Sequence, residues 1–230
     1  QCLLSSVIGG RSGNRGMCAQ PCRKPYTLVT GDRDEYGRPE RIRTLRSAGQ
    51  YLLSPKDLCT YRYLPELVRS PVVSLKIEGR MKSPEYVAVV VSTYRRALDA
   101  IASGDWTPSP AAEQDLLLAF NRGFTRGYLL GDRHGTLMAR GAPDNRGICI
   151  GNVLKQDDQS GTVTLHLNGT LVPETGDGLL FSDPAKRQDD WGFLLNNIPL
   201  ATGERTIMFG VPRTVAPGSS VSVTSSRDLD

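Results

Sequence analysis

Residues 72–86 read Val72-Val73-Ser74-Leu75-Lys76-Ile77-Glu78-Gly79-Arg80-Met81-Lys82-Ser83-Pro84-Glu85-Tyr86, and this stretch decides the fold class. The run from Val72 to Ile77 is almost continuously apolar and β-branched, as is typical of a buried parallel strand. Ser83-Pro84-Glu85 follows as a helix start, with a capping hydroxyl, a proline at the first helical position and an acid in the first turn. A strand followed by a helix predicts an α/β layer with a parallel sheet.

Neighbouring segments extend this pattern in both directions. The helix that opens at Ser83 keeps its apolar residues at helical spacing and ends at Gly104, and another helix is expected over about 111–121. Ser54-Pro55-Lys56-Asp57 predicts a further helix, which would carry Cys59 on its first turns and run to about Val68. Short strands are expected at 26–29 and 51–53, with a hairpin turn over 31–39 between them. The first residues are expected to be a strand entered partway, with further chain upstream.

From Ile148 the pattern changes to short alternating strands separated by Gly, Asp, Asn and Pro. This spacing indicates a small all-β barrel or sandwich, and we expect a barrel. The predicted architecture is a partial TIM-barrel-like α/β domain at 1–130, a linker at 131–146 and a β-barrel domain at 147–225. The strands of the last domain are expected at 148–154, 161–167, 178–181, 205–211 and 219–224.

The charge is divided unevenly along the chain. The total is +4, but residues 1–104 carry 17 Lys and Arg against 9 Asp and Glu, whereas residues 151–230 carry 6 against 10. A basic half suggests an anionic partner such as RNA, although solvated Arg-rich loops would explain it equally well. No run of about 18 apolar residues occurs, which excludes a membrane-spanning helix, and the start does not read as a signal peptide.

The five cysteines carry the most specific chemical signal. An odd number without secretory features argues against a disulfide framework and predicts a reducing, cytoplasmic setting. Thiolates that converge from different chain segments hold metal ions and iron–sulfur clusters. On spacing alone zinc and a cluster fit equally well, and unrelated buried thiols are the remaining alternative. The candidate ligands are Cys2, Cys18, Cys22 and Cys59.

Three blocks resemble the peptidase U32 (collagenase-like protease) family. They are residues 2–5 with 14–23 (CLLS and NRGMCAQPCR), residues 53–59 (LSPKDLC) and residues 75–86 (LKIEGRMKSPEY). The resemblance covers residues 1 to about 130 strongly and the remainder more loosely. It implies a (β/α) barrel and, for several members, oxygen-independent hydroxylation of a tRNA uridine, a ribosomal RNA cytidine or the ubiquinone ring.

The resemblance also implies a [4Fe–4S] cluster on four cysteines, with zinc, or no metal after aerobic purification, as the alternatives. One ligand of the family pattern lies a few residues before Cys2 and is missing here, which leaves the fourth ligand open, and Cys22 could take its place. The absent first half of the barrel would be supplied by an N-terminal segment or by a partner subunit.

Residues just past the predicted strand 72–77 would surround a pocket mouth, where barrel enzymes place functional groups. Lys76, Glu78 and Arg80 are the catalytic candidates, although a structural ion pair among them is the alternative. Cationic side chains among the cysteines and after the strand suit RNA backbone contacts or a solvated loop. The RNA-binding candidates are Arg11, Arg15, Arg23 and Lys82.

Three functions stay open on the sequence. The first is an iron–sulfur hydroxylation factor acting on tRNA or rRNA. The second is a collagenase-like peptidase, which the sequence favours less because only His134 and His166 are available as a base and neither an HExxH nor a GxSxG motif occurs. The third is a non-catalytic fragment that another segment or subunit completes.

Overall fold

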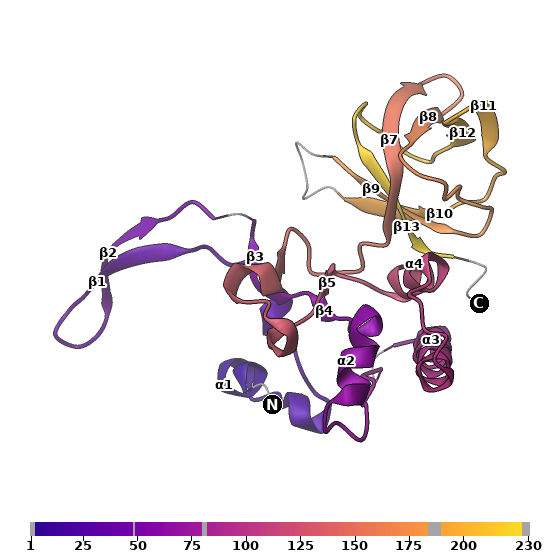
Figure 1. Ribbon diagram of the computed structural model, residues 1–230. Helices are drawn as coiled ribbons and strands as arrows, with labels where there is room; N and C mark the ends of the chain where they lie inside the picture. Colours follow the sequence, from indigo (N-terminus) through magenta and orange to yellow (C-terminus); the bar gives the residue numbers. More distant parts are fainter. Residues whose placement is uncertain (1–2, 48, 80–81, 184–189, 227–230) are drawn as a thin grey trace. The chain divides into compact units, whose positions relative to one another are not determined.

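The computed structural model describes residues 3–47, 49–79, 82–183 and 190–226 (Figure 1). Its contacts divide the chain into two compact units, each assembled from segments distant in sequence. Unit 1 comprises residues 1–59 and 122–144, and unit 2 comprises residues 60–121 and 145–230. Residues 1–130, which were predicted to form one α/β domain, are therefore divided between the two units.

Unit 1 is built from short elements. Its first element is the helix α1 (Leu4–Gly9), so the strand predicted at the start of the chain is wrong. This helix ends at Gly10, whose φ of 65° is the left-handed conformation that glycine adopts without strain. The other elements are η1 (Gly13–Arg15), η2 (Pro21–Arg23), β1 (Val29–Arg33), β2 (Pro39–Thr44), β3 (Tyr51–Pro55), β4 (Asp57–Leu58), β5 (Phe124–Thr125), η4 (Tyr128–Leu130), η5 (His134–Leu137) and β6 (Met138–Arg140).

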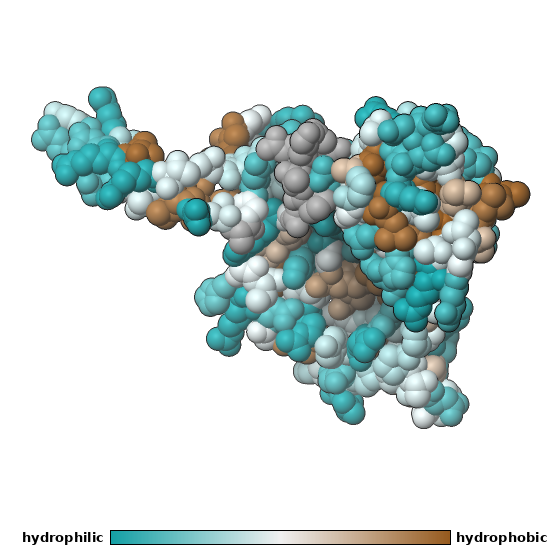
Figure 2. Space-filling model, turned by 90° about the horizontal axis from the view of Figure 1, so that it is seen from above, coloured by the Kyte–Doolittle hydropathy of each residue, from teal (hydrophilic) through white to brown (hydrophobic). Residues whose placement is uncertain are grey.

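Strand pairing in unit 1 is local and limited. β1 and β2 form an antiparallel hairpin, with its turn near the predicted place, and all their residues are exposed. The hairpin lies at the left of Figure 2, where it is mostly hydrophilic. β3 pairs antiparallel with β6, which confirms the strand predicted at 51–53, and β4 pairs parallel with β5.

The helix predicted from Ser54 to Val68 is wrong over its first half. Ser54 lies in β3 with no exposed surface, and residues 57–58 form β4. The helical part begins with η3 (Tyr61–Tyr63) and continues as α2 (Leu64–Arg69), where Pro65 stands in the first turn. Pro65 and Glu66 supply the start signals that the sequence analysis assigned to Pro55 and Asp57.

The helices of unit 2 follow the sequence closely. The helix α3 (Pro84–Ser103) begins where Ser83 Oγ accepts the backbone N–H of Tyr86, at 3.3 Å, and ends at Gly104 with a φ of 85°. Its buried face includes Val90 and Ala97. The helix α4 (Pro110–Ala119) packs against α3 and the C-terminal sheet, and its Leu118 belongs to the sheet's core. The helices predicted at 83–104 and 111–121 are therefore confirmed.

The C-terminal part of unit 2 is a seven-stranded antiparallel sheet in the order β10-β9-β13-β7-β8-β12-β11. Alternate residues of its central strands are buried, as in β8 and β12, and form one hydrophobic core with Phe181 at 2% exposure. Among the described residues its two end strands are not paired, so no closed barrel is found. The strands are β7 (Ile148–Asp157), β8 (Thr162–Leu167), β9 (Gly178–Ser182), β10 (Trp191–Leu194), β11 (Leu200–Gly203), β12 (Thr206–Gly210) and β13 (Ser220–Ser225).

The fold is thus mixed, with helices and strands in both units. All five strands predicted after residue 147 are present, and β10 and β11 were missed. Within the described ranges the single parallel pairing is β4 with β5, so the TIM-barrel-like part of the predicted fold is not observed there. In the same ranges, no helix has the length and apolar character that a membrane span requires.

Candidate functional site

Three of the four predicted cysteine ligands lie in unit 1. Cys18 is exposed in the loop between η1 and η2, Cys22 is half-buried within η2, and Cys59 is half-buried directly after β4. None of the three is in a disulfide. Cys2 lies outside the described residues. Cys149 belongs to unit 2, where it lies on β7.

The loop that carries Cys18 is anchored to α1. The buried hydroxyl of Ser5 accepts the backbone N–H of Ala19 at 2.9 Å, and Arg11 Nε donates to the carbonyl of Met17 at 2.9 Å. The sulfur of Cys18 accepts the backbone N–H of Gln20 at 3.3 Å. Hydrogen bonds of this kind to cysteine sulfur help set the potential of iron–sulfur centres.

Arg23 anchors η2 to β3. Its guanidinium donates to Ser54 Oγ at 2.6 Å and to the carbonyl of Pro55 at 2.8 Å. Burial and the nearby charge of Arg122 lower the pKa of Arg23. The group that was predicted to bind RNA is thus already engaged inside the unit, and it fixes the position of the neighbouring Cys22.

The segment before Cys59 is held by an ion pair. Asp57 accepts the backbone N–H of Arg122 at 2.8 Å and Arg122 Nε at 3.2 Å, and a second guanidinium nitrogen also contacts the carboxylate. The Cys59 N–H donates to the carbonyl of Thr125 at 3.0 Å, which continues the β4–β5 pairing. Asp57 is therefore a structural anchor rather than a helix cap. Arg122 could not be recognised from the sequence as its partner, because the two residues are 65 positions apart.

A polar hollow of about 540 Å³ opens beside Cys18. Three cationic side chains line it, with one carboxylate and one aromatic ring among the other residues. A concave surface of this composition can bind a phosphate or carboxylate next to a thiol. The lining includes Arg11, Cys18, Gln20, Arg23, Lys24, Tyr51 and Asp144.

The cysteine set suits a cluster in its chemistry, since thiolates are the usual ligands of iron–sulfur centres. Among the described residues, however, no group of three or more His, Cys, Asp or Glu side chains is arranged to hold a metal ion. Convergence of Cys18, Cys22 and Cys59 with Cys2 stays a prediction.

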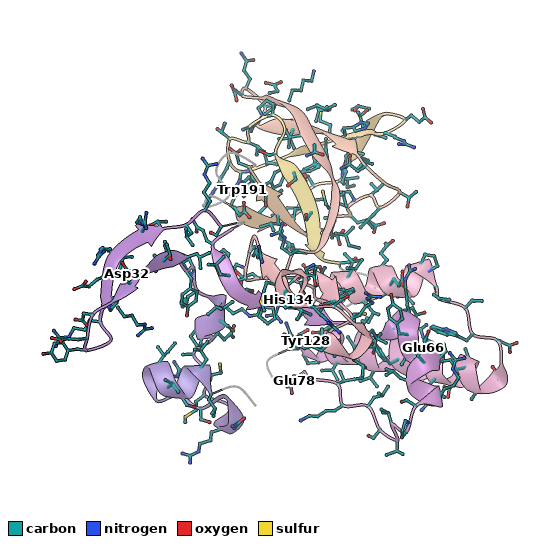
Figure 3. The ribbon with its side chains drawn as sticks, turned by 60° about the vertical axis from the view of Figure 1, so that its left-hand side comes forward. Asp32, Glu66, Glu78, Tyr128, His134 and Trp191 are labelled. Atoms are coloured by element: carbon teal, nitrogen blue, oxygen red, sulfur yellow. The ribbon has the colours of Figure 1, made fainter. Side chains whose placement is uncertain are left out.

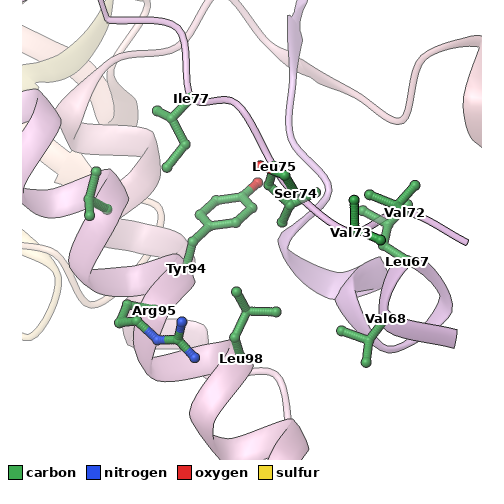
Figure 4. A pocket seen from close by; sticks show the side chains of 11 residues that line it. Leu67, Val68, Val72, Val73, Ser74, Leu75, Ile77, Tyr94, Arg95 and Leu98 are labelled. Atoms are coloured by element: carbon green, nitrogen blue, oxygen red, sulfur yellow. The ribbon is translucent and has the colours of Figure 1, made fainter. Parts of the chain in front are cut away.

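The strand predicted at 72–77 is wrong within the described residues, where this segment has no regular structure. A parallel strand needs backbone partners, and none of the described strands pairs with it. Val73 is 99% exposed, and the segment borders an apolar groove of about 440 Å³ against α2 and α3 (Figure 4).

The catalytic candidates lie on this segment of unit 2. Lys76 and Glu78 are both exposed (Figure 3 labels Glu78). The backbone carbonyl of Glu78 accepts the hydroxyl of Tyr86 at 3.4 Å. Lys82 Nζ lies over the rings of Tyr86 and Phe120, an arrangement that favours a cation. Arg80 lies outside the described residues.

The two units differ in charge. Unit 1 carries 14 Lys and Arg against 7 Asp and Glu, whereas unit 2 carries 14 against 17. Arg11 and Arg15 are exposed in unit 1, and their contact with RNA stays a prediction. His134, in η5, and His166, in β8, belong to different units (Figure 3 labels His134).

Comparison with known proteins gives consistent results. The model of peptidase family U32 matches residues 1–139. A collagenase of Porphyromonas gingivalis W83 is 30% identical over 96% of this chain and 53% of that protein. A tRNA hydroxylation protein of Bacillus subtilis is 32% identical over 80% of this chain and 43% of that protein. A 23S rRNA 5-hydroxycytidine synthase of Escherichia coli is 36% identical over 67% of this chain and 23% of that protein.

The chain spans about half the length of the first of these relatives and less of the other two. Among solved structures, the C-terminal domain of a U32 peptidase of Geobacillus thermoleovorans matches with a TM-score of 0.27 and 21% identity, over 34% of this chain and 92% of that chain. The family model covers more than half of the chain, and the relatives agree with it. The chain therefore belongs to peptidase family U32.

Proposed function

We propose that the chain is part of an iron–sulfur-dependent, oxygen-independent factor that hydroxylates an RNA base in the cytoplasm. Two of the relatives described above are named for hydroxylation of tRNA and of 23S rRNA. The observation that carries the proposal is that all three described cysteines of the predicted set lie in the unit with net charge +7. RNA is a polyanion, so such a unit can bring it to the thiols.

The proposed cluster ligands are Cys2, Cys18, Cys22 and Cys59. A [4Fe–4S] cluster supplies one-electron redox chemistry when it is bound. The protein's own part is to fix the loop of Cys18 through Ser5 and Arg11 and to hold η2 against β3 through Arg23. Zinc on the same thiolates is the competing metal.

Lys76, Glu78 and Arg80 are proposed to contact the reacting groups, with Lys82 near them. Lys76 and Glu78 are exposed, which leaves their side chains accessible to substrate. Several apolar side chains between Val72 and Ile77 are exposed, and exposed apolar surface of this kind is typical of a site that contacts another protein segment. We propose that this stretch joins a barrel sheet completed by a segment or subunit outside these 230 residues.

A collagenase-like peptidase is the second candidate, because the relative named collagenase matches 96% of this chain. It would use carboxylates such as Glu78, which is exposed. Gelatin cleavage that Glu78→Gln abolishes and Cys18→Ala leaves intact would favour this candidate.

The test of the hydroxylase is made on RNA from cells. The complete protein and its Cys18→Ala and Cys149→Ala variants are expressed anaerobically in a strain that lacks its own U32 hydroxylation factors. Nucleosides from tRNA and rRNA are then analysed by mass spectrometry. We expect one pyrimidine nucleoside to gain one oxygen atom with the wild type and with Cys149→Ala but not with Cys18→Ala. The absence of any oxidised nucleoside with the wild type would refute the proposal.

A further inference from the structure

The β1–β2 hairpin has no hydrophobic core of its own. Every residue of its two strands is exposed, including Val29 at 48% and Ile42 at 54%. An isolated two-stranded hairpin is at best marginally stable in water. A hairpin of this kind is expected to gain stability when it contacts a partner.

Charge on the hairpin is segregated along its length. All four of its carboxylates lie between residues 32 and 40, near the tip, and Figure 3 labels Asp32 among them. There Asp32 pairs with Arg41 at 3.6 Å, and Asp34 accepts the backbone N–H groups of Tyr36 and Arg38. By contrast, residues 24–31 and 41–56 contain no Asp or Glu. The base of the hairpin is therefore purely cationic.

The base of the hairpin leads into the hollow beside Cys18. The N–H of Tyr26 donates to the carbonyl of Gln50 at 2.8 Å, and the N–H of Leu45 donates to the carbonyl of Leu28 at 2.9 Å, so the pairing continues below β1 and β2. Lys24, just before this paired stretch, lines the hollow together with Arg11. We select four cations of the hairpin base and the hollow and call them the basic strip, which consists of Arg11, Lys24, Arg43 and Arg46.

The strip has the properties of a phosphate-binding surface. Within the part of the chain that the structure describes, Lys24, Arg43 and Arg46 form no ion pair. Arg43 lies opposite Thr30 in the hairpin, so its neighbour across the strands is uncharged. Guanidinium groups bind phosphate in a bidentate manner, and release of counterions from RNA drives such binding.

We propose that the basic strip binds the phosphate backbone of the RNA substrate and leads it from the hairpin to the hollow beside Cys18. This inference rests on the proposed function in taking RNA as the substrate, and it adds the surface that holds it. Contacts to phosphates position an RNA without reading its sequence, so selection of the base is left to other groups.

Fluorescence anisotropy with a labelled, unmodified tRNA transcript tests the strip on the full 230-residue chain at several salt concentrations. Arg43→Glu/Arg46→Glu is expected to weaken binding about tenfold or more at low salt, and the loss of two phosphate contacts should lower the salt slope by about 2. The matched control is Arg33→Glu/Arg38→Glu, which makes the same charge change at the tip of the same hairpin. It should lie within about twofold of the wild type.

The proposal would be overturned if the wild type and the base variant bound RNA equally well. It would also be overturned if the tip variant weakened binding as much as the base variant does. If the base variant keeps its RNA affinity but elutes differently from the wild type in size exclusion, the hairpin contacts protein and the inference fails. Its failure is distinguishable from that of the proposed function. If the base variant binds RNA as tightly as the wild type but cellular RNA is still oxidised, only the RNA-binding role of the strip is refuted. If the base variant binds RNA more weakly but no RNA is oxidised, only the hydroxylase proposal is refuted.

Discussion

The ion pair of Asp57 with Arg122 gives the most direct test of how the site is held. Asp57→Asn keeps the shape of the side chain and removes its charge. The Asp57 and Arg122 side chains are 25% and 17% exposed, and several hydrogen bonds join them. A hydrogen bond to a charged group contributes about 1.5–3 kcal/mol, and breaking a buried pair costs about 3–5 kcal/mol.

Because the pair is partly exposed and Asn retains one acceptor, we expect a loss of about 2 kcal/mol. The positive charge of Arg122 would also remain next to Arg23 without the negative charge of Asp57. Hydrogen exchange of the Asp57 and Cys59 amides, which donate to Gly123 and Thr125, reports the local opening. These amides should exchange about 30-fold faster in the variant.

Asp99→Asn is the matched control for this prediction. Asp99 pairs with Arg95 on the surface of α3, where the two side chains are 65% and 60% exposed. Surface pairs at this spacing contribute about 0.5 kcal/mol or less, so exchange in α3 should rise about twofold at most. An equal, small effect of both variants would refute the anchoring role of Asp57.

Other outcomes follow from single contacts. Hydrogen bonds from Arg126, from Thr125 and from the Arg126 backbone lower the pKa of Asp132 to about 2. The stabilising effect of the ionised Asp132 carboxylate should be complete above its unfolded pKa of about 4 and disappear as the pH falls through about 2. An NMR titration of the Asp132 carboxyl group with its midpoint near pH 4 would contradict this. Ser83→Ala removes the cap of α3 and should cost about 1 kcal/mol in denaturant unfolding, whereas Ser92→Ala, exposed on the same helix, should have little effect. Phe181→Ala opens the core of the sheet, where Phe181 is 2% exposed, and should cost about 3–5 kcal/mol of thermal stability; a loss below about 1 kcal/mol would contradict the packing.

The elements that the sequence predicted best are those whose signals are local. Ser83 and Gly104 bound α3 as expected, because a cap and a left-handed glycine act on adjacent residues. The strand β8 alternates half-buried and buried residues in the way its sequence does, with Val163, Leu165 and Leu167 buried. β11 was missed because its sequence, LATG, does not alternate polar and apolar residues. All four of its residues are exposed, so the strand needs no buried face.

The errors come from residues whose partners are distant in sequence. Ser54-Pro55-Lys56-Asp57 has every local feature of a helix start, yet Ser54 binds Arg23 and Asp57 binds Arg122. Val72 to Ile77 has the composition of a buried strand, but a strand forms only where another strand pairs with it. For the candidate site, spacing singled out the cysteines, whose role as ligands stays a prediction, and the charge count identified residues 1–104 as basic. The sequence analysis did not single out Arg43 and Arg46 of the proposed basic strip, whose signal is the acid-free stretch from 41 to 56.

Iron bound by the thiols of unit 1 is the central claim, and its most direct measurement is the iron, sulfide and zinc content of protein purified without oxygen. We expect a brown protein that contains iron and sulfide, equal amounts of both in Cys149→Ala, and loss of both in Cys18→Ala, Cys22→Ala and Cys59→Ala. Iron that persists in all three variants, or zinc in its place in the wild type, would contradict this claim.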